Sequence, residues 1–414
     1  MKSNYKPLGK YIQPVVGRNN DLGDLPLVGL SIQKKFIPSI ANTIGTDMST
    51  YRIIERNQFA YGPVTSRNGD KITIALFNDF DKALISQAYI PFEVKDHREL
   101  DPEYLMMWFR RPEFDRYARF KSHGSAREIF DWEEMCNVML PVPHIDKQRE
   151  IVKEYNTIQN RIALNQQLIQ KLEETAQVIY KQWFVEFEFP DESGKPYKSN
   201  GGEMIWNEEL GKEIPKDFQI ASIGKYSKVK SGFAFKSEWW QSSGIPVIKI
   251  GSINNNTIDA YSLDFVSNDK VEKAKNYIVQ EGDIVIAMTG ATIGKIGLVP
   301  ELNDTILVNQ RVGMFDLGRK PIERAAFLYF NLLHDFVQNE IKSVGGDSAQ
   351  ANISYSQIQE IQMLYPTSDL IQKFNRIGKP IIETILRKIK GNQKLTELKE
   401  LLLSKLATVE NLRV

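Results

Sequence analysis

The stretch IVKEYNTIQNRIALNQQLIQKLEETAQVIYKQWF, residues 151–184, decides the fold of this 414-residue chain. Its apolar positions recur in alternating steps of four and three residues, the 3.5-residue period of a helix that packs along one narrow seam. The seam positions are Ile151, Tyr155, Ile158, Ile162, Asn165, Ile169, Leu172, Ala176, Ile179 and Trp183. The pattern predicts one long helix over residues 146–185, with Asp146 as its N-cap.

A second stretch, from Phe374 to Val409, keeps the same steps with more polar interruptions. Pro380 and Gly391 cost about 3 and 1 kcal/mol in a helix interior, so we expect a kink or break near 376–380. Asn165 and Asn392 are equivalent seam positions and could pair if the helices pack antiparallel about a pseudo-twofold axis. The alternative is two amphipathic helices, each packed on its own globular domain.

Short motifs recur at nearly constant separation along the chain. The pairs are LGKY at 8–11 with IGKY at 223–226, YRIIE at 51–55 with YIVQE at 277–281, SQAY at 86–89 with NQRV at 309–312, and MLP at 139–141 with MLY at 363–365. Their offsets of 215, 226, 223 and 224 are too steady for chance. They predict a duplicated domain, which can present two similar surfaces to a bipartite target.

The repeat and the helices divide the chain into five segments. We expect a first domain over 1–145, a helix over 146–185, a connector over 186–217, a second domain over 218–366 and a helix over 367–414. The connector is rich in Gly, Pro, Ser, Asn and charge. Short β-type runs at 71–77 and 283–288, with helical stretches near 101–120 and 321–342, predict that each domain is α+β.

Composition excludes several classes of protein. A single cysteine, Cys136, and four scattered histidines leave neither a disulfide framework nor a Cys/His zinc site. No apolar run approaches the ~20 residues of a membrane span, and the polar start MKSNYKPLGK is unlike a signal peptide. We expect a cytoplasmic protein with no membrane partner. Net charge is only +1, so any binding of nucleic acid must come from local basic surfaces.

A set of motifs in the second half carries a specific resemblance. The motifs are SGFAFKS at 231–237, GIPVIKIG at 244–251, GDIV at 282–285, TGATIGK at 289–295 and NQ at 309–310, preceded by IYKQWFVEF at 179–187. In this order, and with the duplication, the chain resembles the specificity subunits of type I restriction-modification systems over essentially its whole length. The first domain departs from the pattern, because it lacks the 231–237 motif and has GPVTSRNG at 62–69 in place of the 289–295 loop.

The resemblance implies two homologous α/β target recognition domains separated by two long antiparallel coiled-coil helices. Each domain would read one half of a split asymmetric site in double-stranded DNA, and the helices would set the gap and dock two modification (methyltransferase) subunits. Restriction subunits, ATP-dependent endonucleases and translocases, would join to cut. The chain itself would be non-catalytic and hold no cofactor. The methyltransferase subunits would bind S-adenosylmethionine and flip the target base.

Side-chain chemistry supplies candidate contacts. DNA readers need Lys or Arg for phosphates, and planar amides or Arg for base edges, on loops or helix ends. In the first domain the candidates are Arg67, Asn68, Gln87, Lys121, Ser122, His123, Ser125 and Arg127. In the second domain they are Lys230, Phe233, Lys236, Lys249, Thr289, Lys295, Gln310, Arg311, Lys342, Ser348, Gln350 and Asn352. The loops 122–127 and 343–352 are matched under the repeat.

Some of these residues also have interpretations that do not involve contact with DNA. The basic stretch 110–127 has six basic and two acidic side chains, yet an Arg-rich helix at 110–119 is more often a solvated face than a DNA surface. Gln87 and Gln310, equivalent under the repeat, fit an adenine reader and a buried amide at a strand end equally well.

Enzyme alternatives find little support. A self-contained adenine methyltransferase needs an Asn/Asp-Pro-Pro-aromatic motif, and the sequence has no Pro-Pro pair. The phosphate-loop likeness of Gly290–Lys295 is one residue short between its glycines, with Ile296 where Ser or Thr is required, so a turn is expected there. Glu93-Val94-Lys95 lacks the upstream Asp set of a nuclease. The remaining rival is a coiled-coil protein–protein adaptor without DNA sequence readout, which predicts no salt-sensitive DNA binding.

Overall fold

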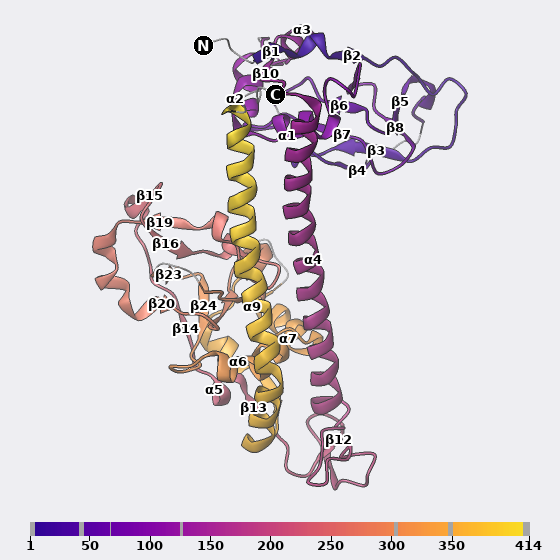
Figure 1. Ribbon diagram of the computed structural model, residues 1–414. Helices are drawn as coiled ribbons and strands as arrows, with labels where there is room; N and C mark the ends of the chain where they lie inside the picture. The colour runs from indigo at the N-terminus through magenta and orange to yellow at the C-terminus, as the bar shows by residue number, and fades with distance from the viewer. Residues whose placement is uncertain are drawn as a thin grey trace. The chain divides into compact units, whose positions relative to one another are not determined.

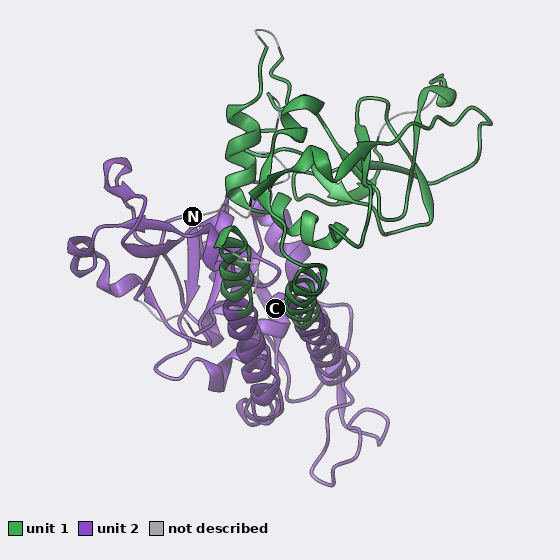
Figure 2. Cartoon of the chain, turned by 45° about the horizontal axis from the view of Figure 1, so that its top comes forward, with its two compact units in different colours: residues 1–161, 395–414 green, residues 162–394 purple. Residues whose placement is uncertain are grey.

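The computed structural model describes residues 5–40, 45–66, 68–124, 127–301, 305–346 and 351–408. Figure 1 labels its helices and strands. The chain forms two compact units: unit 1 comprises residues 1–161 and 395–414, and unit 2 comprises residues 162–394 (Figure 2). Both units mix strands and helices, and both contain a stretch of each long helix, so the predicted α+β class is confirmed.

Unit 1 is built on two four-stranded sheets, with strand orders β2-β9-β6-β7 and β4-β3-β8-β5. Their strands are β2 (Ile12–Pro14), β3 (Leu27–Leu30), β4 (Phe36–Pro38), β5 (Arg52–Glu55), β6 (Phe59–Tyr61), β7 (Ile74–Leu76), β8 (Lys82–Ile85) and β9 (Ile90–Val94). The remaining elements are β1 (Tyr5–Pro7), η1 (Leu8–Lys10), η2 (Met48–Thr50), α1 (Pro102–Phe109), α2 (Pro112–Phe120), α3 (Trp132–Cys136) and β10 (Met139–Pro141). The antiparallel pair β1–β10 brings the start of the domain back to its end.

Unit 2 repeats this plan with additions, in sheets ordered β14-β24-β21-β22-β18-β17 and β15-β19-β16-β23-β20. Its strands are β11 (Met204–Asn207), β12 (Lys212–Pro215), β13 (Gln219–Ser222), β14 (Val229–Ser231), β15 (Trp240–Gln241), β16 (Ile245–Ile248), β17 (Ile253–Asn254), β18 (Thr257–Ile258), β19 (Asp264–Val266), β20 (Ile278–Val279), β21 (Ile284–Ala287), β22 (Ile296–Leu298), β23 (Ile306–Val308), β24 (Val312–Phe315) and β25 (Gln362–Tyr365). Its helices are α5 (Ile223–Tyr226), α6 (Ile322–Leu332), α7 (Asp335–Gly345) and α8 (Tyr355–Glu360), with η3 (Ser237–Trp239), η4 (Ile250–Ser252), η5 (Ala260–Ser262), η6 (Asn268–Lys270), η7 (Glu272–Tyr277) and η8 (Gly290–Thr292). The short helix η8 and the turn after it occupy the loop expected at 289–295.

The duplication is visible strand by strand. The parallel pair β3–β8 has its counterpart in the parallel pair β16–β23, where Leu84 and Leu307 hold equivalent places. Ile53 lies opposite Leu84, and Ile278 lies opposite Leu307. The structural offset there is therefore 225, one residue less than the motif alignment predicts, because strand pairing rather than sequence likeness fixes the equivalence.

The two long helices are α4 (Ile145–Phe184) and α9 (Ser368–Lys405), the latter followed by the 3-10 turn η9 (Leu406–Thr408). In unit 1, Ile151 and Tyr155 share a buried cluster with Leu403 and Leu406. In unit 2, Asn165 donates a hydrogen bond to Asn392 at 2.8 Å. In each unit the helices therefore run antiparallel, and the predicted asparagine pair is confirmed.

Two details of the helix prediction are wrong. Asp146 is not the N-cap, because α4 begins at Ile145 and Asp146 lies inside its first turn, where an acid still favours the helix dipole. The break expected near 376–380 is absent, because α9 is continuous through Pro380. Phe374 and Ile382, on either side, are fully buried, and burial of two such side chains at ~1.5–3 kcal/mol each outweighs the proline penalty.

The expected connector is an ordered part of unit 2. The strands β11 and β12 form an antiparallel hairpin. Phe187, Phe189 and Phe218 around it belong to the main buried cluster of the unit, and the rings of Phe189 and Phe218 stack at 5.4 Å. Aromatic side chains within a polar stretch thus hold this segment against the core.

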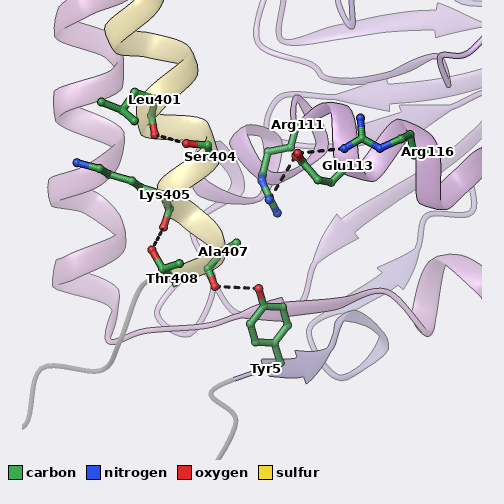
Figure 3. A network of polar contacts seen from close by, with 9 residues as sticks. All are labelled: Tyr5, Arg111, Glu113, Arg116, Leu401, Ser404, Lys405, Ala407 and Thr408. Atoms are coloured by element: carbon green, nitrogen blue, oxygen red, sulfur yellow. Dashed lines mark hydrogen bonds and ion pairs between the residues drawn. The ribbon is translucent and has the colours of Figure 1, made fainter.

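The end of α9 is anchored to the first strand of the chain within unit 1. The hydroxyl of Tyr5 donates to the carbonyl oxygen of Ala407 at 2.9 Å (Figure 3). Leu403 and Leu406 are buried in the same core as α1. Unit 1 is therefore completed by the last part of the chain that the structure describes.

Candidate nucleic-acid interface

The two units carry hollows at equivalent places. In unit 2 a hollow of about 600 Å³ is lined by Ser231, Ile250, Met288, Thr289, Gly290, Gln310, Arg311, Ala351 and Asn352. In unit 1 a smaller hollow, about 280 Å³, is lined by Leu30, Gly62, Pro63, Val64, Asn68, Thr73, Ala88, Tyr89 and Arg127. The pairs Leu30 with Ile250, Pro63 with Met288, and Ala88 with Arg311 match under the repeat, whereas Arg127 and Asn352 lie two positions apart on the matched loops. The structure therefore brings several predicted residues together in each unit.

Backbone bonds between two loops build the hollow of unit 2. The N–H of Gly290 donates to Ala351 O at 2.8 Å, and the N–H of Ile353 donates to Met288 O at 3.0 Å. Gly290 has a φ of +67°, which glycine tolerates without a Cβ penalty. The Oγ1 of Thr289 is buried with no hydrogen-bond partner among the described residues. The hollow thus presents a hydroxyl beside the exposed Asn352.

The turn at the end of β23 presents Gln310 and Arg311 to solvent. The N–H of Gln310 donates to Phe233 O at 2.9 Å, and the N–H of Arg311 donates to the buried Oδ1 of Asn309 at 3.2 Å. In unit 1 the N–H of Ala88 donates in the same way to Ser86 Oγ at 3.3 Å. Gln87 and Gln310 are both exposed, so the buried-amide interpretation is wrong for both, and Asn309 fills that role.

The loop beside the hollow of unit 1 is held by side chains from the candidate set. Asn68 Nδ2 donates to Val64 O at 3.1 Å. The hydroxyl of Thr65 donates to Ser122 Oγ at 2.9 Å, and Ser122 donates to Ala118 O at 2.7 Å. Asn68 and Ser122 therefore shape the loop, whereas Arg127 is exposed at the hollow.

The basic stretch before that loop is largely neutralised. Arg111 is buried, and both it and Arg116 contact Glu113, at 3.3 and 3.2 Å. Arg119 pairs with Glu128 at 2.6 Å. Glu134 lies 3.5 Å from Lys121 and 3.9 Å from His123. The helix at 110–119 is therefore better explained as a face that does not bind DNA. The charges of Lys121 and His123 are partly offset by Glu134.

Aromatic rings surround several candidate lysines in unit 2. The ammonium of Lys249 lies 3.5 Å from the centroid of the Trp240 ring and 3.1 Å from Asp264 Oδ2, and Lys236 lies 5.8 Å from the Trp239 ring. Lys230 Nζ donates to Asn276 O at 2.7 Å. Phe233 packs against Phe235, Trp239 and Tyr277, which gives it a structural role.

The remaining candidates differ in what the structure says of them. Lys295 and Lys342 are exposed. Arg67, Ser125, Ser348 and Gln350 lie outside the described residues. Sequence reasoning missed Ser231 and Tyr89, which line the two hollows. Ser231 opens the SGFAFKS motif and Tyr89 ends SQAY, so both were within reach of the motif signal.

Two further observations on the described residues concern metal binding and membrane crossing. Among the described residues there is no group of three or more His, Cys, Asp or Glu side chains placed to hold a metal ion. Within that same part of the chain, the helices are too short or too polar for any to cross a bilayer.

Comparisons with known proteins agree with the duplicated plan. The family described as "Type I restriction modification DNA specificity domain" matches residues 2–174 and 215–400. The type I restriction enzyme MjaVIII specificity subunit of Methanocaldococcus jannaschii is 23% identical over 266 residues, which cover 64% of this chain and 59% of that protein. The HindI specificity subunit of Haemophilus influenzae is 21% identical over 92% of both chains. A crystal structure of a type I restriction-modification system S subunit from M. genitalium matches 98% of this chain with a TM-score of 0.54 at 16% identity, a likeness of fold.

Proposed function

Since this chain belongs to the type I restriction modification DNA specificity domain family, we propose that it selects the DNA sequence for a type I restriction-modification complex. Unit 1 reads one half of a bipartite, asymmetric site in double-stranded DNA, and unit 2 reads the other half. The match covers 59% of the MjaVIII subunit, so the roles of the whole complex are part of the proposal.

One observation carries the proposal most directly. Hollows at equivalent positions of the two units each present an exposed polar side chain on the matched loops, Arg127 in unit 1 and Asn352 in unit 2. Arg pairs bidentately with guanine and Asn with adenine in the major groove. Different side chains on the matched loops of the two units are what an asymmetric bipartite site requires.

The helices provide the second element of the proposal. α4 has 40 residues, so it is about 60 Å long. We assign to α4 and α9 the spacing between half-sites and the docking of two methyltransferase subunits, to which ATP-dependent restriction subunits are added for cleavage. The complex acts in the cytoplasm, where its DNA substrate is accessible.

This chain carries no catalytic step in the proposal. S-adenosylmethionine belongs to the methyltransferase subunits, which extrude the target adenine. The residues at the two hollows position those subunits by holding the flanking bases. Purified chain mixed with DNA and S-adenosylmethionine should transfer no methyl group, and cofactor-dependent methylation by the chain alone would refute this assignment.

The decisive experiment is methylation mapping on a reconstituted complex. The chain is combined with its methyltransferase subunit, and methylated adenines are mapped on genomic DNA. The expected result is one split motif with a constant gap. DNA affinity of the complex should also fall steeply with salt, because lysine and arginine displace counterions. The adaptor alternative predicts neither result, and unpatterned methylation would contradict sequence selection by this chain.

A further inference from the structure

A second cavity, of about 840 Å³, lies in unit 2 and shares no lining residue with the hollow described above. The end of α4, the β11–β12 hairpin, α7, α8 and β25 surround it. Its wall is mostly apolar, from side chains that include Phe184, Leu210, Val337 and Met363. This size and lining are those of a ligand site.

A residue in the lining of this cavity carries a buried acceptor without a partner. Asn331, at the end of α6, is only 3% exposed, and its Nδ2 donates to the hydroxyl of Tyr180 at 2.6 Å. Its Oδ1 is buried and has no hydrogen-bond partner in the part of the chain that the structure describes. An unsatisfied buried acceptor is costly, so an occupant that brings an N–H or O–H donor to it would be held.

The rim of the cavity is acidic. Glu209, Glu340 and Glu360 are exposed at its edge. The one lysine in the lining, Lys212, has its ammonium 5.5 Å from the centroid of the Phe187 ring. Burial lowers the pKa of His334, so this ring is neutral at pH 7. The rim therefore favours a cationic occupant.

Unit 1 has a different pair of side chains at the equivalent positions of the duplicated domain. Arg111 directly precedes α2, as His334 directly precedes α7, which makes Trp108 the equivalent of Asn331. The Arg111 guanidinium lies 4.3 Å from the centroid of the Trp108 ring. It also lies 3.3 Å from Glu113, a contact drawn in Figure 3. Both side chains are more than 90% buried, with 7% and 6% exposed. At these positions, unit 1 thus buries an aromatic ring with an adjoining cation.

We propose that the cavity of unit 2 takes an aromatic side chain with an N–H or O–H donor, next to a basic residue, from one methyltransferase subunit. The partner is taken from the proposed function, on which this inference rests. Because Trp108 and Arg111 stand in unit 1 where Asn331 and His334 stand in unit 2, the site is used once per chain and distinguishes the two docked subunits. Exposed Phe336 and Val344 extend the apolar surface at its mouth, which suits a polypeptide segment better than a small molecule.

The test uses the full chain and its methyltransferase subunit. Val344→Trp narrows the mouth, and Glu209→Lys with Glu340→Lys reverses the rim charge. All three residues are exposed, so the fold should be retained. The matched controls are Asn339→Trp, and Glu208→Lys with Glu272→Lys, which change exposed residues outside the lining. Assembly is followed by native mass spectrometry across a titration, and methylation mapping reports DNA specificity separately.

Two methyltransferase subunits bind in two steps, and we expect one of these steps to weaken at least tenfold in both cavity variants. The other step should be unchanged, the controls should assemble as the wild type does, and the methylated motif should stay the same. Unchanged assembly, or equal weakening of both steps, overturns the proposal. Tryptamine, which combines an indole N–H with an ammonium group, should compete with the weakened step. If tryptamine binds the chain and Val344→Trp blocks it while assembly is unaffected, the occupant is a free amine and the partner assignment is wrong. If the wild-type chain binds no methyltransferase subunit yet binds specific DNA, the assignment of the partner is refuted, whereas the proposed role in reading DNA sequence is retained.

Discussion

Asn165 and Asn392 join the two long helices directly, with Asn165 Nδ2 donating to Asn392 Oδ1 at 2.8 Å. The two residues are equivalent under the internal repeat, so the same position of each copy meets its counterpart. Asn165 is only 6% exposed. A polar pair in an otherwise apolar seam is satisfied in one register alone, and it therefore fixes how α4 and α9 align.

This pair predicts a coupling energy. Asn165→Ala and Asn392→Ala should each lower the free energy of unfolding of unit 2. The sum of the two losses should exceed the loss in the double variant by about 0.5–1.5 kcal/mol, because both single variants lose the same hydrogen bond. Denaturant unfolding of the four proteins of the cycle measures it. Additive effects would mean that the hydrogen bond does not contribute to alignment of the helices.

A second prediction concerns pH. Burial raises the pKa of Asp283 to about 6, against an ordinary value of 3.8. The folded state then binds more protons than the unfolded state between these values, so the free energy of unfolding falls as pH rises from about 4 to about 6 and is flat above. The full shift corresponds to roughly 3 kcal/mol, and partial exposure reduces it. Hydrogen exchange of the β21 amides, compared at pH 5 and pH 7, measures this loss in the free energy of unfolding.

The repeat supplies the substitution that removes this dependence. Asp283 accepts from the N–H of Gln280 at 2.8 Å, and Gln58 in unit 1 accepts in the same way from the N–H of Glu55 at 2.8 Å. Asp283→Gln should therefore keep the hydrogen bond, flatten the pH profile and stabilise unit 2 at pH 7 by about 1–2 kcal/mol. The control is Asp81→Asn, which changes an exposed carboxylate of unit 1, and the β21 amides of unit 2 should exchange in it as they do in the wild type.

A third prediction separates the two half-sites. Arg127→Ala should weaken binding through unit 1 and relax one base of its half-site, whereas Asn352→Ala should do the same for unit 2 alone. Loss of a bidentate base contact costs about 1–3 kcal/mol. Competition binding of the reconstituted complex with DNA altered in either half-site measures it. Uniform weakening on all sequences would instead assign these side chains to phosphates.

A fourth prediction tests the helices as a spacer. Four residues inserted after Gln166, with four more after Asn392, add about 6 Å to both helices and should lengthen the gap by one or two base pairs of 3.4 Å. Both half-site sequences should stay the same in methylation maps. The insertion in α4 alone is the control, because it shifts the seam past its partner and should impair assembly. An unchanged gap with full activity would refute the spacer role.

Sequence periodicity predicted the long helices because a seam of ten positions leaves little freedom in what it packs against. The break expected near Pro380 rested on local helix propensity and was wrong, because burial of the neighbours Phe374 and Ile382 outweighs that propensity. The hollows were only partly predictable. Gln310 and Asn352 stood in recognisable motifs, but strand pairing and loop–loop bonds such as Gly290 N–H to Ala351 O decide which residues meet. Arg111 is paired with Glu113, and Arg119 is paired with Glu128. The sequence pattern around these residues does not reveal either ion pair.

The contact between Tyr5 and Ala407 has a consequence for synthesis of the chain on the ribosome. Unit 2 is one continuous segment, 162–394, whereas unit 1 is assembled from two segments, 1–161 and 395–414, that are far apart in the sequence. Leu403 and Leu406, buried at 3% and 1% exposure, close its core. Domains usually fold in the order in which they emerge. Here unit 1 stays open until residues 403–406 leave the exit tunnel, so a chain truncated before residue 403 would leave unit 1 unfinished and unit 2 complete.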